Sequence, residues 1–160
     1  MFIAKQSRSS LLAPILSVSG IIEKNQTYPI LSNILLEKIG QRVTLFSSDM
    51  DMQIRTWFDL EGMFDKGETL FATTFSARKC IDILRALSDK EDITLEQRDQ
   101  QLYIESNSVE FKLQTLPALD FPKLTTPDEP SVSLVINQQV LRKLISQVHF
   151  AMAYQDIRYY

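Results

Sequence analysis

The sequence is poor in the residues that build most catalytic and metal-binding centres. Its 160 residues include one cysteine, one histidine and four glycines. A single cysteine cannot form an intrachain disulfide, and this sparse usage is typical of a reducing, cytoplasmic environment. The chain also has no glycine-rich phosphate loop, nucleophile elbow or cysteine pair. We therefore expect no catalytic residues, no metal site and no cofactor.

Long apolar runs and targeting signals are missing as well. The most apolar stretch, residues 11–22, contains a proline and several serines and is too short to span a bilayer. The first residues do not have the layout of a signal peptide. Apolar residues make up 44% of the chain, which is ordinary for a folded protein. We expect a soluble, cytoplasmic globular protein with no membrane partner.

One short unit, a strand followed by a capped amphipathic helix, occurs three times. Strands are expected at residues 2–5, in the first half of 68–88, and at 132–136, with helices that start near residues 9, 76 and 138. The expected caps are Ser7, Ser9 or Ser10 for the first helix, Thr74 or Ser76 for the second, and Asn137 for the third. Pro14 is expected early in the first helix, where a missing N–H costs least. The regular spacing favours an internal repeat.

Antiparallel strands are expected in most of the remaining chain. Residues 34–39 and 43–47 are predicted to pair, 53–60 to form another strand, and 92–97, 101–105 and 109–115 to form a meander. These patterns predict an α+β fold. We expect a first domain at 1–122, a linker at 123–130 rich in proline and threonine, and the first strand and helix of a second domain at 131–160. One strand and one helix cannot bury their apolar face, so we expect this sequence to be part of a longer chain.

Charge is unevenly distributed between the expected helices and the rest of the chain. The net charge of −3 alone argues against binding to nucleic acid. The three helices, however, carry six cations against the single acid Asp82, and the remainder, mostly expected strand and turn, is acidic. The six are Arg8, Arg78, Lys79, Arg85, Arg142 and Lys143. A polyanion responds to the local field, so a basic helical face favours a DNA-binding surface. The alternative is a set of solvated helix faces without function.

Three other features allow more than one interpretation. Asp49 and Asp51 share a face in extended chain, which would suit a divalent metal or an acid–base pair, but a turn is the simpler interpretation. His149 ends the third helix and is expected to be a partly buried helix-end residue. Residues 154–160 contain three tyrosines and Arg158, which could stack on bases, fill a partner's pocket, or form a half-buried strand of a second sheet.

Five stretches of the sequence together resemble the bacterial sliding clamp family, the beta subunit of DNA polymerase III. They are residues 27–36, 48–52, 75–79, 113–122 and 150–160, and they lie in the family's order over essentially the whole chain. The resemblance implies the DNA-clamp fold, in which each domain packs two helices on antiparallel sheets. It also implies a replication processivity factor without enzymatic activity. Two such subunits close head to tail around double-stranded DNA and tether DNA polymerase III, the clamp loader and other partners.

The resemblance further implies roles for individual residues. It assigns contacts with DNA to Lys24, Asn25, Arg78, Arg142, Lys143, Gln155, Tyr159 and Tyr160. It assigns part of a pocket for partner peptides to Arg158, Tyr159 and Tyr160, and the subunit interface, on an exposed edge strand, to Lys79, Phe111 and Leu113. We expect this sequence alone not to close the homodimeric ring. Two other hypotheses are an adaptor that binds proteins but no DNA, and a small metal-dependent enzyme that uses Asp49 and Asp51.

Overall fold

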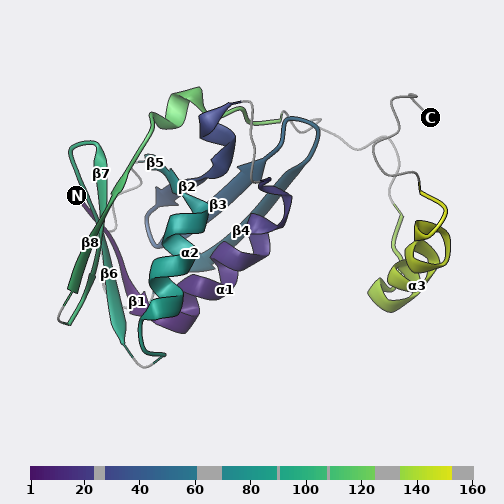
Figure 1. Ribbon diagram of the computed structural model, residues 1–160, viewed down its shortest axis with the longest axis horizontal. Coiled ribbons are helices and arrows are strands. Elements are labelled where there is room, and N and C mark those ends of the chain that lie inside the picture. The colour runs from purple at the N-terminus through teal and green to yellow at the C-terminus, as the bar shows by residue number, and fades with distance from the viewer. Residues whose placement is uncertain (24–27, 61–69, 90, 108, 125–133, 153–160) are drawn as a thin grey trace. The chain divides into compact units, whose positions relative to one another are not determined.

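The computed structural model spans residues 1–160 and describes all of them except 24–27, 61–69, 90, 108, 125–133 and 153–160 (Figure 1). The chain divides into two compact units, Met1–Thr125 and Thr126–Tyr160. The first unit holds nearly all of the regular structure, whereas the described part of the second unit holds one helix.

The first unit consists of two halves with the same order of elements: one strand, one helix and three strands. The first half contains β1 (Phe2–Ser7), α1 (Arg8–Val18), β2 (Asn33–Ile39), β3 (Arg42–Ser48) and β4 (Gln53–Asp59). The second half contains β5 (Phe71–Ser76), α2 (Ala77–Ala86), β6 (Asp92–Arg98), β7 (Gln101–Ser106) and β8 (Val109–Gln114). Three short 3₁₀ helices, η1 (Ser19–Ile21), η2 (Pro29–Ser32) and η3 (Ala118–Asp120), lie between or after them. The repeat predicted from the sequence is confirmed for its first two copies.

The strands form two antiparallel four-stranded sheets, ordered β1-β6-β7-β8 and β4-β3-β2-β5. The first strand of each half pairs with the other half's sheet, because β1 lies against β6 and β5 lies against β2. The paired strands and the meander expected from the sequence are all present. This exchange of strands ties the halves together, so neither sheet is complete without both.

One hydrophobic core joins both sheets to both helices of the first unit. Leu11, Ile15 and Val18 enter it from α1, and Cys80 and Leu84 from α2. The sheets contribute, among others, Ile3, Leu36, Leu45, Phe75, Ile93, Leu102 and Ile104. Burial raises the pKa of the Cys80 thiol to about 12, because a thiolate would be poorly solvated there. Cys80 is thus the small buried hydrophobe that the sequence predicts.

Helices α1 and α2 start where the sequence predicts, but only one of them has the expected capping hydrogen bond. The Ser7 side chain accepts a hydrogen bond from the backbone N–H of Ser10 and caps α1. Ser76 occupies the cap position of α2, yet its side chain makes no capping hydrogen bond. Thr74, the other expected cap, accepts instead from Asn33 at 3.1 Å and donates to the carbonyl of Leu116 at 2.9 Å. A hydroxyl buried in a sheet is held by its neighbours there and cannot also reach the helix.

The prediction for Pro14 was wrong in position. Capping by Ser7 starts α1 at Arg8, so Pro14 lies inside the helix, beyond its first turn. A proline there has no N–H for the carbonyl four residues earlier, which costs about 3 kcal/mol in a helix interior. The packing of Leu11, Ile15 and Val18 into the core offsets this cost.

The described part of the second unit consists mainly of α3 (Gln138–His149), which the Asn137 side chain caps by accepting from the N–H of Gln139 at 2.9 Å. Residues 134–136 form no strand, so this part of the predicted third strand was wrong; a strand needs a partner to pair with, and none is described here. His149 is exposed, not partly buried. Apolar side chains of α3 are between 43% and 62% exposed: Val140, Leu141, Leu144, Ile145 and Val148. None of the described helices is long and apolar enough to cross a membrane.

Replacing Pro14 by alanine is expected to stabilise the protein. Pro14→Ala restores a backbone hydrogen bond within α1, and the free energy of unfolding should rise by about 1 to 3 kcal/mol in urea titrations. Pro117→Ala, outside the regular helices and strands, is the matched control and is expected not to raise it. A loss of stability in Pro14→Ala would contradict this account of α1.

Candidate nucleic-acid interface

Helices α1 and α2 lie side by side on the first unit (Figure 1). The Arg8 side chain joins them, because its Nε donates to the carbonyl oxygen of Leu84 at 2.7 Å and its guanidinium pairs with Asp89. The Leu84 carbonyl is among the last of α2 and has no partner within the helix. Arg8 therefore caps the carboxyl end of α2, and its side chain is only 15% exposed. The prediction that it belongs to the basic outer face was wrong.

The cations of α2 itself point away from the core. Four positions of this helix, Ala77, Cys80, Ile81 and Leu84, are buried and recur at helical spacing. Arg78, Lys79 and Arg85 lie elsewhere on the circumference of the helix and are exposed. None of these three cations forms an ion pair with an acid of the described chain, whether Asp82 on the same helix or a residue elsewhere. With the exposed Asp82 among them, they form a surface of net positive charge, called here the α2 basic face.

A hollow of about 560 Å³ lies beside the α2 basic face, between α2 and the chain that follows α1. All three of its cations line the hollow, together with Ser19, Ser32 and Ser76 and with two acids, Glu23 and Asp82. Serine hydroxyls and guanidinium groups are both donors to phosphate oxygens. The exposed side of α1 adds small residues and no acid, namely Ser9, Ser10, Ala13 and Ser17. The arrangement can attract a polyanion and places no carboxylate from α1 in its way.

The strands are electrically neutral, which corrects the expected acidic strand layer. They carry six cations, Lys5, Lys38, Arg42, Arg55, Arg98 and Lys112, and six acids, Glu37, Asp59, Asp92, Glu96, Glu105 and Glu110. The acidic excess of the chain therefore lies outside the described helices and strands. Sequence spacing could place acids near strands but could not separate a strand's end from the turn beside it.

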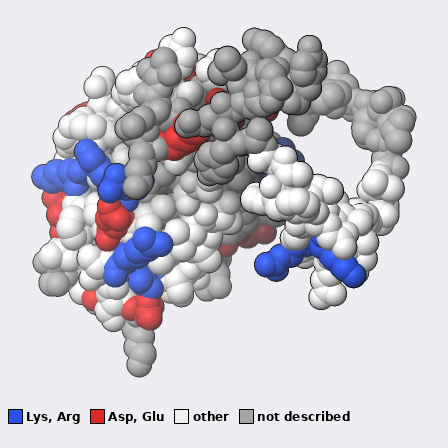
Figure 2. All heavy atoms as spheres, turned by 45° about the vertical axis from the view of Figure 1, so that its right-hand side comes forward, with Lys and Arg blue, Asp and Glu red and all other residues white. Residues whose placement is uncertain are grey.

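Half of the strand cations are neutralised by ion pairs. Arg98 contacts Glu96, Glu105 and Glu110 from three neighbouring strands, and Lys112 also contacts Glu110. The hydrogen bond from Arg98 lowers the pKa of Glu96. Figure 2 shows such red and blue groups side by side on the first unit, whereas the described residues of the second unit carry cations and no acid. The other three strand cations, Lys5, Lys38 and Arg55, have no described acidic partner.

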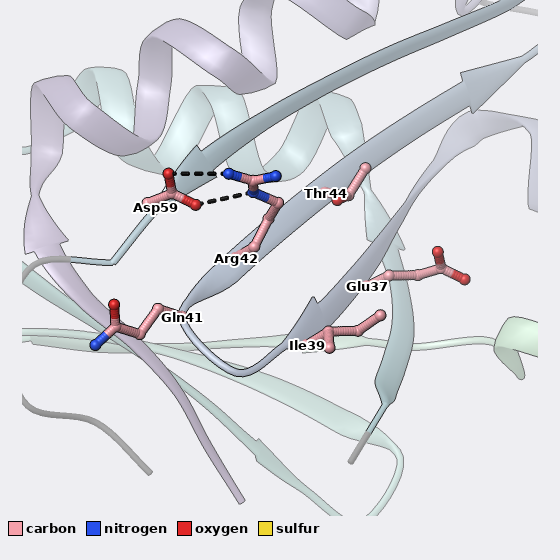
Figure 3. A pocket seen from close by; sticks show the side chains of 6 residues that line it. All are labelled: Glu37, Ile39, Gln41, Arg42, Thr44 and Asp59. Carbon is pink, nitrogen blue, oxygen red and sulfur yellow. Dashed lines mark hydrogen bonds and ion pairs between the residues drawn. The ribbon is translucent and has the colours of Figure 1, made fainter. Parts of the chain in front are cut away.

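A second hollow, of about 410 Å³, lies over β2, β3 and β4 (Figure 3). Arg42 and Asp59 line it side by side from the neighbouring strands β3 and β4, with two hydrogen bonds of 3.0 and 3.3 Å. The hydrogen bond from Arg42 lowers the pKa of Asp59. Both groups are largely exposed and already satisfy each other, which is the usual state of a surface ion pair. This hollow offers a ligand no uncompensated charge.

The carboxylate of Asp49 holds a turn. Its Oδ1 accepts from the backbone N–H groups of Asp51 and Met52, at 3.0 and 2.7 Å. No group of three or more potential metal ligands occurs within the described ranges. This geometry agrees with the interpretation of Asp49 and Asp51 as turn residues.

The residues expected at functional sites fall into three groups. Lys24, Asn25, Gln155, Arg158, Tyr159 and Tyr160 lie outside the described residues. Arg78 and Lys79 are exposed neighbours on α2, and Arg142 and Lys143 are exposed neighbours on α3. Phe111 and Leu113 lie on β8, which is an edge strand as expected. Leu113, however, is buried in the core and Phe111 is half-buried, so only the backbone of β8 and part of Phe111 are available at that edge.

Arg85 was not among the residues assigned to DNA, although the structure places it on the α2 basic face. Seven residues separate it from Arg78, or about two helical turns, which brings both side chains to the same side. That spacing is visible in the sequence and could have identified it.

Two helices packed on two four-stranded antiparallel sheets, in two like halves, define an α+β domain of the DNA-clamp class. Residues 2–125 match the family described as the DNA polymerase III beta subunit, N-terminal domain. The beta sliding clamp of Pseudomonas aeruginosa is 39% identical over 154 residues, which cover 96% of this chain and 40% of that protein. The Escherichia coli K12 beta sliding clamp is 35% identical over 153 residues, with the same coverage.

Solved structures give the same result. A crystal structure of the DNA polymerase III subunit beta from Pseudomonas aeruginosa superposes with a TM-score of 0.90 at 34% identity, covering 99% of this chain and 42% of that one. The beta subunit of Caulobacter crescentus gives a TM-score of 0.85 at 31% identity, covering 97% and 40%. The chain belongs to the bacterial beta sliding clamp family. It spans about 40% of the length of the relatives it matches.

Arg8 and Arg78 are expected to differ in their effect on stability. Arg8→Met leaves the Leu84 carbonyl and Asp89 without their partner and should lower the free energy of unfolding by about 1 to 3 kcal/mol. Arg78→Met removes an exposed side chain and should change it by less than about 0.5 kcal/mol. Urea denaturation followed by circular dichroism measures both. Equal losses would show that Arg78 is also a structural residue.

Proposed function

We propose that this chain acts in DNA replication as part of a ring-shaped processivity factor that encircles duplex DNA and tethers DNA polymerase III. The α2 basic face is the observation that carries the proposal, because its three cations have no described acidic partner. The second unit contributes Arg142 and Lys143, on a helix without acids. Membership of the sliding clamp family supports this function over other roles for a basic surface.

The chemistry of the proposed site suits sliding better than tight binding. Arginine and lysine attract phosphate through a field that is largely independent of base sequence. A few exposed cations give a weak, salt-dependent interaction, so the protein can move along the duplex while the ring keeps it attached. Holding DNA in this way requires no chemical step, and the chain is proposed to work without catalysis or a cofactor.

The remaining assignments follow from the family. We propose DNA contacts for Lys24, Asn25, Arg78, Arg142, Lys143, Gln155, Tyr159 and Tyr160. We add Arg85, which shares the α2 basic face. Arg158, Tyr159 and Tyr160 are proposed to form part of a pocket for peptides of the polymerase and clamp loader. The protein is proposed to work in the cytoplasm, where the chromosome is replicated.

We propose that β8, with its residues Phe111 and Leu113, and Lys79 of α2 form the subunit interface of a head-to-tail homodimer. An edge strand with unpaired backbone groups can extend a sheet into a neighbouring subunit. A first domain over residues 1–122, a linker over 123–130 and a second domain from 131 complete the proposed organisation. The exposed apolar side of α3 supports it, because further chain of a complete second domain would cover that side.

Removing cations from the α2 basic face is expected to weaken binding to duplex DNA and its dependence on salt. The slope of log K against log salt is negative. Arg78→Met and Arg85→Met should each reduce its magnitude by about 0.9, the value for one phosphate contact. Fluorescence anisotropy with a labelled 20-bp duplex, from 20 to 150 mM salt, measures this slope.

Arg42→Met is the matched control for that experiment, because Arg42 is exposed but already paired with Asp59. It should leave the slope unchanged. Equal slopes for all three variants, or no salt-dependent binding by the wild-type chain, would favour an adaptor that binds proteins and never touches DNA.

The 160-residue chain alone is expected to stay monomeric and not to form a ring. Its mass is 18.4 kDa, and light scattering after gel filtration should report a monomer of that mass. The physical reason is that an edge strand needs a complementary edge, and the proposed partner edge belongs to a further domain. A stable dimer or larger ring of this chain would contradict the proposed interface.

A further inference from the structure

A small pocket on the first unit shares no lining residue with the hollow beside α2. Its walls come from three separate stretches: η2 with the residue before it, the turn after β3, and the chain at the end of η3. The lining residues are Tyr28, Ile30, Leu31, Met50, Asp120 and Pro122. Five of these six side chains are apolar or aromatic, so the pocket presents hydrocarbon to a ligand.

The base of the pocket is fixed by packing. Leu31 is only 3% exposed, and Ile30 packs against a second hydrophobic cluster made of Leu35, Phe46 and Phe121. The N–H of Leu31 donates to the Tyr28 carbonyl at 3.0 Å, which holds η2 in shape. The pocket is therefore largely formed before a ligand binds, and the entropic cost of ordering it on binding is small.

The rim exposes two large side chains. Tyr28 is 57% exposed and Met50 is 50% exposed. Met50 has a φ of 82°, a left-handed conformation that a non-glycine residue rarely adopts. The Ser48 hydroxyl accepts from the N–H of Met50 at 3.1 Å, and the Asp49 carboxylate secures the next two residues. The turn thus holds an apolar side chain at the surface at a cost in backbone energy, a combination that is common at binding sites.

One acid lines this apolar seat, and two more lie beside one of its residues in the sequence. Asp120 lines the pocket, and Asp49 and Asp51 flank Met50 in the sequence. Within the described chain no cation pairs with any of the three. Lys123, which follows Pro122, pairs instead with Glu37 and lies over the Phe46 ring. Arg55, four residues after Asp51, forms no ion pair with these acids either. The three acids therefore favour a ligand with positive charge.

The volume of the pocket decides the class of ligand. It is about 160 Å³, whereas sites for cofactors and drug-sized molecules are about 300 to 1,000 Å³. A space of this size accepts one large apolar side chain. Such side chains, seated in a pocket and surrounded by weaker contacts, are the usual anchors of protein–protein interfaces.

We propose that this pocket docks a short linear segment of a partner protein, in which a leucine or phenylalanine is flanked by lysine or arginine. The apolar side chain enters between Tyr28 and Met50, and the flanking cations lie near Asp49, Asp51 and Asp120. The site differs from the peptide pocket proposed around Arg158, because it uses residues of the first unit alone. It also does not depend on DNA binding, so either proposal can fail without the other.

The test uses the 160-residue chain and three fluorescein-labelled peptides measured by anisotropy. The probes are Gly-Lys-Lys-Leu-Phe-Lys-Gly, its acidic counterpart Gly-Glu-Glu-Leu-Phe-Glu-Gly, and Gly-Lys-Lys-Ala-Ala-Lys-Gly, which lacks the anchor. The first peptide should bind, and the third should bind at least about tenfold more weakly. In heteronuclear NMR the first peptide should shift the signals of Ile30, Leu31 and Met50. The acidic peptide should not shift these signals, even if it binds the cations of α2.

Two methionines in one turn provide a matched pair of variants. Met50→Ala removes a wall of the pocket and should weaken binding of the first peptide about fivefold to tenfold. Met52→Ala removes a methionine that is 55% exposed but does not line the pocket, and should leave binding unchanged. Asp120→Asn should weaken binding more at 20 mM than at 300 mM salt, since screening removes its contribution. Asp92→Asn, an exposed acid on β6, is its control.

Several results would overturn the proposal. They are equal loss of binding in Met50→Ala and Met52→Ala, equal shifts of the pocket signals by basic and acidic peptides, or no binding of the first peptide at millimolar concentration. Shifts of the same NMR signals on dilution of the protein without peptide would show that a second copy of the chain occupies the pocket, and would also overturn it.

Discussion

The packing of α2 onto the sheets is the constraint on which the rest of the structure depends. An α-helix that buries Ala77, Cys80, Ile81 and Leu84 has only one orientation about its axis. In that orientation Arg78, Lys79 and Arg85 have to face solvent. The Arg8 side chain binds the Leu84 carbonyl and so helps to hold the end of the helix in this orientation. Core packing thus positions the proposed DNA contacts, although none of the contact residues belongs to the core.

Charge pairing distinguishes part of the strand surface from the α2 basic face. The strands carry as many cations as acids, and Arg42, Arg98 and Lys112 each contact a carboxylate. A phosphate that approaches these groups competes with an acid already paired to them, whereas the cations of the α2 basic face form no ion pair with Asp82 or with another described acid. A chain with a net charge of −3 can therefore present a surface that attracts DNA.

The sequence predicted most of the fold of the first unit, because hydrophobic periodicity and turn residues are local signals. Both repeated helices, the meander and the burial of Cys80 follow from such patterns. Arg8 was misjudged because its partners, Leu84 and Asp89, are distant in sequence, and no local pattern shows that contact. The neutral strands were missed for another reason, since a count of their charges depends on the exact residue at which each strand ends. Met50 shows a third limit, because its positive φ arises from a turn that no glycine marks.

The central claim is that DNA approaches the α2 basic face and not the strands. The most direct test is a heteronuclear NMR titration of the chain with a 12-bp duplex at low salt. The account predicts shifts of the backbone signals of Arg78, Lys79 and Arg85, and none for Arg42, Arg98 and Tyr103 on the strands. Shifts centred on the strand residues, with α2 unaffected, would contradict it.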